Sequence, residues 1–213
     1  MSRRPIPGRV ALSTAQDTAV ASVLAPSPRR RLAIDARGYA ASARQIRSPN
    51  RDVRPAGTAV TLIVVHGISL PPGEYGGDGI MRLFTNRLDP RAHPYYAAIA
   101  GMKVSAHFLI RRDGELVQFV GCFERAWHAG ASAWKGRECC NDFSIGIELE
   151  GADDVAYAAA QYTMLARLIR VLRRTFPIDD IVGHVDIAPG RKTDPGPAFD
   201  WARLRRLLAP RAR

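Results

Sequence analysis

Residues 59–65, which read A-V-T-L-I-V-V, constrain the fold of this chain more than any other stretch. The run is apolar except for Thr61, and most of its residues are β-branched. Such a run is typical of a strand that is covered on both faces, as in largely parallel sheets. We predict that this strand ends in His66, where a loop rich in glycine and proline begins and runs to residue 79.

The other segments alternate between strand and helix patterns. Residues 105–111 and 115–120 predict a hairpin around Asp113 and Gly114. Residues 143–149 alternate, which places apolar side chains on one face of a strand and Glu148 on the other. Helices are predicted at residues 80–88, 156–176 and 199–208, with a short strand at residues 180–183. This order predicts an α/β fold: a single domain with a central mixed β-sheet flanked by helices.

Most of the net positive charge of the chain lies in its first quarter. Residues 1–54 hold 11 arginines against three aspartates, whereas residues 55–213 hold 20 lysines and arginines against 17 acidic residues. Residues 1–32 lack periodicity, so we predict a basic, weakly ordered extension there and the folded domain at residues 33–213. The extension has no aromatic residues between its arginines and no recognised binding motif, so no nucleic-acid partner is expected.

Two further features bear on where the protein acts. No apolar run approaches the roughly 20 residues of a membrane span, and no secretory signal is recognisable near the N-terminus. The chain has three cysteines, two of them adjacent, which is not the pattern of a disulfide framework. We therefore predict a cytoplasmic protein with no membrane partner and no obligate protein partner.

Residues 183–201, G-H-V-D-I-A-P-G-R-K-T-D-P-G-P-A-F-D-W, combine polar side chains with glycines and prolines that fix the backbone. This pattern favours a functional loop. Zinc in a hydrolase takes three protein ligands and leaves a fourth position for water. We predict that His66, His184 and Asp194 bind one zinc ion per chain. The alternative ligands are His107, His128, Asp186, Cys139 and Cys140.

Four other residues are candidates for catalysis or binding. Glu148 is the candidate general base, although a partly exposed strand glutamate is the alternative. Lys192 lies two residues before Asp194 and could stabilise an oxyanion, or could be a surface lysine. His128 follows Trp127 and could contact a substrate, while Tyr95 could line a cleft or only pack.

The candidate residues belong to a set of motifs that occur in a fixed order. These are V-V-H-G-I-S-L-P-P-G-E-Y-G-G, V-S-A-H-F-L-I-R-R-D-G-E, R-A-W-H-A-G, N-D-F-S-I-G-I-E-L-E-G and the 183–201 segment. Over residues 34–208 the chain resembles the zinc-dependent N-acetylmuramoyl-L-alanine amidases of the AmpD type. This family lies in the wider superfamily of amidases and peptidoglycan-recognition proteins.

The resemblance implies a function and roles for individual residues. It implies zinc binding by His66, His184 and Asp194, acid–base catalysis by Glu148 and stabilisation of the tetrahedral intermediate by Lys192. The implied reaction is cleavage of the amide between the lactyl group of 1,6-anhydro-N-acetylmuramic acid and L-alanine, in cytoplasmic peptidoglycan recycling. The implied partner is therefore a small muropeptide. A non-catalytic peptidoglycan-fragment-binding protein of the same fold is the alternative, and the complete set of five residues argues against it.

The resemblance also suggests substrate contacts. Trp127 could stack on the sugar, and Lys103 stands where an arginine that grips a stem-peptide carboxylate is expected. Gly67 and Cys139 depart from the family pattern, in which asparagine and arginine, respectively, are expected.

Overall fold

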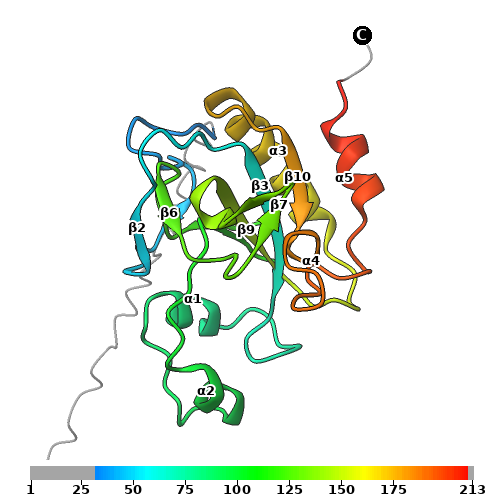
Figure 1. Ribbon diagram of the computed structural model, residues 1–213. Helices are drawn as coiled ribbons and strands as arrows, with labels where there is room; N and C mark the ends of the chain where they lie inside the picture. Colours follow the sequence, from blue (N-terminus) through cyan, green and yellow to red (C-terminus); the bar gives the residue numbers. More distant parts are fainter. Residues whose placement is uncertain (1–31, 211–213) are drawn as a thin grey trace, which may run out of the picture.

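A six-stranded mixed sheet forms the centre of the computed structural model, which describes residues 32–210 (Figure 1). The strands follow the spatial order β1 (Arg44–Gln45), β5 (Leu116–Gln118), β4 (Phe108–Ile110), β9 (Ser144–Glu150), β3 (Leu62–Ile68) and β10 (Asp180–Gly183). β4 and β5 pair antiparallel, and the other neighbours in the sheet pair parallel. The predicted α/β class with a central mixed sheet and the predicted antiparallel hairpin are confirmed.

The helices and the remaining strands surround this sheet. The helices are α1 (Gly79–Phe84), α2 (Pro94–Ile99), α3 (Ala159–Thr175), α4 (His184–Ile187) and α5 (Trp201–Leu208), with a 3-10 turn at Cys140–Asp142. Two small antiparallel sheets pair β2 (Arg51–Val53) with β6 (Glu124–Ala126), and β7 (Ala133–Trp134) with β8 (Arg137–Glu138). In Figure 1, α1 and α2 lie together on one side of the sheet, away from α3 and α5. Within residues 32–210, no helix has both the length and the apolar character needed to cross a bilayer.

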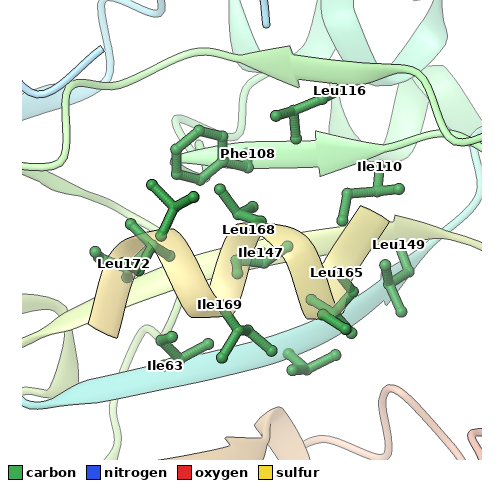
Figure 2. Packing of buried hydrophobic residues seen from close by; sticks show 14 of the residues in the cluster. Ile63, Phe108, Ile110, Leu116, Ile147, Leu149, Leu165, Leu168, Ile169 and Leu172 are labelled. Atoms are coloured by element: carbon green, nitrogen blue, oxygen red, sulfur yellow. The ribbon is translucent and has the colours of Figure 1, made fainter. Parts of the chain in front are cut away.

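α3 covers one face of the sheet and forms the main core with it (Figure 2). Its predicted apolar stripe is confirmed, because Leu165, Leu168, Ile169 and Leu172 are all buried against the strands. α5 packs against α3 through Leu204. Burial of apolar area stabilises by about 25 cal/mol per Å², so this helix–sheet layer is the main source of stability.

The other face of β3 is buried as well. Leu62 and Val64 point away from α3 and pack with Phe143, Val182 and Ile187 in a separate apolar cluster. Because successive strand residues alternate between faces, a strand covered on both sides needs apolar side chains at every position. The structure thus accounts for the continuous apolar run from which the sheet was predicted.

Several predicted boundaries are wrong, each for a local reason. β3 extends to Ile68, so His66 lies inside the strand rather than at its end. α1 stops at Phe84 because Asn86 adopts a left-handed backbone with φ of 56° and bonds the Asn50 side chain instead. α3 begins at Ala159, because the Gln161 side chain accepts a hydrogen bond from the backbone N–H of Ala158 and so caps the helix.

Two other expectations need revision. The segment 183–201 was predicted as a loop, but its first turn is the helix α4. Leu32, predicted to lie in the N-terminal extension, is 5% exposed and belongs to the main core. The rest of that predicted extension lies outside the described residues.

The packing of α3 gives a stability prediction. Leu168→Ala removes a fully buried side chain from the helix–sheet layer, so we expect the free energy of unfolding to fall by about 2–5 kcal/mol. Arg167→Ala, on the exposed face of the same helix turn, is the matched control and should change it by less than about 0.5 kcal/mol. Urea unfolding followed by circular dichroism measures both; equal losses in the two variants would contradict this core assignment.

Candidate metal and active site

The pairing of β3 with β9 places His66 beside Glu148. The two strands are parallel and in a register that makes these residues direct neighbours. Paired residues of neighbouring strands point to the same face of the sheet. The preceding residues, Val65 and Ile147, point to the opposite face, into the main core. His66 and Glu148 are 1% and 8% exposed. The prediction that Glu148 leaves the apolar side of its strand is confirmed, whereas the alternative of a partly exposed glutamate is not.

β10 delivers the second histidine to the same edge. It pairs parallel with β3, with Gly183 beside Val65, so the next residue, His184, emerges next to His66. The strand turns there into α4. The chain then returns, and the backbone N–H of Val185 donates a hydrogen bond of 3.0 Å to the carbonyl of Asp194. The strands β3, β9 and β10, which are far apart in sequence, therefore bring side chains together at the carboxyl ends of adjacent strands.

The side chains of His66, His184 and Asp194 converge on one point. The two Nδ1 atoms are 3.0 Å apart, and Asp194 Oδ2 lies 3.2 Å from His66 Nδ1 and 3.1 Å from His184 Nδ1. Ligand atoms at about 2.05 Å from a tetrahedral zinc ion are separated by about 3.3 Å. The three atoms thus fit the ligand set of one small cation, with room for a fourth ligand.

The protonation states suit such a set. Burial lowers the pKa of His66 to about 4, so its ring is neutral near pH 7 and has a lone pair to share. The neutral imidazole of His66, the His184 ring and a carboxylate are side chains of the kinds that bind zinc.

Glu148 stands beside this trio in a different electrostatic state. Burial raises the pKa of its carboxyl well above the ordinary value, and the nearby Asp194 raises it further, while Lys192 opposes the shift. Carboxyls with a raised pKa are common among the residues that act as general acids or bases in enzymes. Next to the candidate ligand Asp194, the site therefore holds a second carboxyl whose pKa is raised.

The trio and Glu148 lie at the floor of a cavity of about 510 Å³. Its walls come from β3, β9, α1, α2 and α4, and from loops that include residues 102–105, 127–128, 151–153 and 192–194. Of the nine site residues predicted from the sequence, eight line this cavity: His66, Tyr95, Trp127, His128, Glu148, His184, Lys192 and Asp194. Lys103 does not line it and is exposed, although its neighbours Met102 and Val104 do line it.

The residues considered as alternative metal ligands make other contacts in the structure. His107 is buried, contacts the Arg54 guanidinium and accepts a hydrogen bond from the backbone of Gly146. The Asp186 carboxylate accepts from the Gly183 N–H at the start of α4. Cys139 is exposed and Cys140 packs in the apolar cluster of β3. Among the described residues, the group that brings His, Cys, Asp and Glu ligand atoms within reach of one ion is the predicted trio.

The sequence analysis missed residues that hold the site together. Tyr157, placed in the predicted helix, lies before it and donates a hydrogen bond to the carbonyl of Pro195, next to Asp194. A Cβ on Gly67 would lie 2.2 Å from the Tyr157 hydroxyl, so the small residue and the tyrosine fit together. Glu150 is 2% exposed and accepts from the N–H of Gly76, which fixes the loop after β3. Only the strand alternation that singled out Glu148 could have indicated Glu150.

Fold and site together define an α/β protein with a His-His-Asp ligand set at the carboxyl ends of parallel strands. The sequence profile of the family described as N-acetylmuramoyl-L-alanine amidase matches residues 56–197. The 1,6-anhydro-N-acetylmuramyl-L-alanine amidase AmpD of Escherichia coli is 59% identical over 174 residues, which cover 81% of this chain and 95% of that protein. The chain belongs to the N-acetylmuramoyl-L-alanine amidase family and is an amidase.

Solved structures agree with this assignment. The crystal structure of a selenomethionine AmpD derivative superposes with a TM-score of 0.82 at 57% identity, covering 84% of this chain and all of that chain. The Escherichia coli amidase AmiD, in complex with anhydro-N-acetylmuramic acid-L-Ala-D-gamma-Glu-L-Lys, gives 0.51 at 28% identity, over 83% of this chain and 65% of that one. A peptidoglycan-recognition protein, PGRP-LE, gives 0.51 at 16% identity, over 72% and 87% of the two chains, and shares the fold. The predicted family resemblance is confirmed.

The burial of Glu148 leads to a prediction for the metal-free protein. A carboxyl whose pKa is higher in the folded than in the unfolded state destabilises the fold when ionised, and this cost disappears as the pH falls below both values. Glu148→Gln should therefore raise the melting temperature of the metal-free protein at pH 8 by at least about 2 °C, roughly the effect of 1 kcal/mol in a domain of this size.

The gain should shrink toward pH 4, where Glu148 becomes protonated in both the folded and the unfolded state. Calorimetry across this pH range measures the difference between variant and wild type. Glu138→Gln, on an exposed strand, is the control and should show no such trend. A Glu148→Gln variant that is less stable than wild type at pH 8 would contradict the electrostatic description of the site.

Proposed function

We propose that this protein is a zinc-dependent amidase of cytoplasmic peptidoglycan recycling. Its proposed substrate is a muropeptide in which the lactyl group of 1,6-anhydro-N-acetylmuramic acid is joined by an amide bond to L-alanine. The observation that carries the proposal is the convergence of His66, His184 and Asp194 on one point, with Glu148 on the next strand. The AmpD relatives are 1,6-anhydro-N-acetylmuramyl-L-alanine amidases, which supports this substrate.

His66, His184 and Asp194 would hold the zinc ion. When bound, zinc supplies Lewis-acid chemistry, which polarises a carbonyl group and lets water ionise near neutral pH. Glu148 lies beside this point on the cavity floor, so it can take the proton of the attacking water and deliver it to the leaving nitrogen of L-alanine. Its pKa, raised mainly by burial, suits a group that must accept a proton and then return it.

Lys192 would stabilise the negative charge that develops on the attacked carbonyl oxygen. It is half-buried, lines the cavity and lowers the pKa of Glu148, so its ammonium acts within this site. A cation held in a partly desolvated cavity stabilises a developing oxyanion more strongly than one in water does. The lysine is thus suited to the transition state of amide hydrolysis.

The cavity suits a substrate with a sugar at one end and a peptide at the other. Trp127 is half-buried on the wall and offers an aromatic face to the sugar ring. Tyr95 projects from α2 on another wall and is 41% exposed. Lys103 stays our candidate for binding a carboxylate of the stem peptide. It does not line the cavity, so this contact would form outside it. The AmiD complex with an anhydromuropeptide supports this class of ligand.

Removal of the metal tests the proposal directly. Dialysis against a chelator should abolish cleavage of a purified anhydromuropeptide, and one equivalent of zinc should restore it, because zinc supplies the ionised water in the proposed mechanism. Mass spectrometry should find the anhydromuramic acid and the free peptide, with zinc content measured on the same sample. Full activity in verified zinc-free protein, or cleavage at another bond, would refute the proposed function.

Substitution of the acid–base residue separates catalysis from metal binding. Glu148→Ala should retain zinc while turnover falls by about 10²–10⁴-fold, the usual contribution of general acid–base catalysis. Lys192→Ala should also lower turnover with zinc retained, and Lys135→Ala, an exposed lysine paired with Asp180, is its control. A Glu148→Ala enzyme as fast as wild type would remove this residue from the mechanism.

A further inference from the structure

A chain of hydrogen bonds runs from the candidate ligand His66 through His128 and Ser144, two residues that the proposed mechanism does not use. His66 Nε2 lies 2.9 Å from His128 Nδ1, and His128 Nε2 lies 3.1 Å from Ser144 Oγ. Ser144 Oγ in turn lies 2.5 Å from the carbonyl oxygen of Cys140. All three side chains are at least nine-tenths buried, so this network is closed off from bulk water.

The end of the network fixes its direction. A backbone carbonyl only accepts, so the single hydroxyl proton of Ser144 is donated to Cys140. Ser144 Oγ can then only accept from His128, which places the proton of the neutral His128 ring on Nε2. His128 Nδ1 is left as an acceptor and must receive the proton of His66 Nε2. The lone pair of neutral His66 therefore lies on Nδ1, the atom that faces Asp194 and His184.

The second histidine is fixed by the residue next to His128. His184 Nε2 lies 3.2 Å from the carbonyl oxygen of Ala129, which only accepts, so His184 carries its proton on Nε2 and its lone pair on Nδ1. The Arg191 guanidinium donates to the same carbonyl at 2.6 Å and holds it in place. His128 and Ala129 thus set the tautomers of both rings, one through a side chain and the other through the backbone.

The surrounding residues keep the His128–Ala129 segment in position. The side-chain oxygen of Asn141 accepts from the backbone N–H groups of both residues, at 3.0 and 2.8 Å. A Cβ on Gly146 would lie 2.4 Å from the His128 ring, so this glycine of β9 leaves the space that the ring occupies. Ser144, Gly146 and Glu148 share one face of β9. The face that presents Glu148 to the cavity therefore also seats His128.

We propose that His128 and Ser144 are positioning residues that lock His66 in the tautomer required for metal binding, while the Ala129 carbonyl does the same for His184. The competing arrangement reverses the chain: His66 would donate from Nδ1 to Asp194 and could not bind a metal through that atom. The Ser144–Cys140 hydrogen bond excludes this reversal. Such outer partners of ligating histidines typically change metal affinity by 10–100-fold. The proposal rests on the proposed zinc site and adds a group of residues that prepares it.

Nitrogen NMR of the metal-free protein tests the proposal without zinc or activity. The chain has five histidines, so proton–nitrogen correlations of the ring atoms can be assigned by single substitutions. We expect His66, His128 and His184 of the wild type all to carry their proton on Nε2. A wild-type His66 with its proton on Nδ1 would overturn the proposal. In Ser144→Ala, a population of His66 with the proton on Nδ1 should appear.

Zinc affinity, measured by competition with a chelating dye at one fixed pH, gives the second readout. Ser144→Ala should weaken zinc binding by about 10–100-fold. Ser48→Ala is the matched control, because Ser48 is also buried and also donates to a carbonyl at 2.5 Å, that of Phe84, outside the hydrogen-bond network of His66 and His184. It should bind zinc as the wild type does.

The outcomes separate this proposal from the proposed function. Wild-type affinity in Ser144→Ala, or an equal loss in Ser48→Ala, would overturn the positioning role while leaving the zinc amidase intact. Wild-type protein that binds no zinc would overturn the proposed function itself. Should Ser144→Ala fold poorly, the tautomers of the metal-free wild type still decide the question.

Discussion

The parallel pairing of β3 with β9 on one side and β10 on the other is the constraint on which this structure depends. It aligns His66 with Glu148 and brings His184 in from the neighbouring strand, so that the site is assembled by strand register. Because side chains alternate along a strand, a slip of one residue would turn His66 into the core. The apolar faces of β3, which pack on α3 and on a second cluster, are what hold this register.

Assembling this site requires several polar side chains to be buried close together. His66, His128, Glu148 and His184 are all at least nine-tenths buried on one edge of the sheet. Each of the three histidines makes a hydrogen bond to the protein through Nε2, which offsets part of the penalty for burying polar atoms. For Glu148, burial and the nearby Asp194 disfavour the ionised form and raise the pKa of the carboxyl.

Loops complete what the strands begin. Asp194 reaches the two histidines because Val185 and Tyr157 hold the loop that carries it, through hydrogen bonds to the carbonyls of Asp194 and Pro195. Asn141 anchors His128 and Ala129 in the same manner. The three candidate ligand atoms are thereby held close together by the protein itself, which would reduce the ordering that ion binding requires.

Features that depend on residues close together in the sequence could be predicted from it, whereas features that depend on distant residues could not. Local patterns determined the strand at β3, the hairpin of β4 and β5, the apolar stripe of α3 and the outward face of Glu148, because side-chain periodicity follows from backbone geometry. The motifs indicated His66, His184 and Asp194. The convergence of those three atoms within 3.2 Å, the placement of Tyr157 beside Gly67 and the chain from Cys140 to His66 were decided by the tertiary structure alone. Each depends on the packing of segments distant in sequence, which no local pattern encodes.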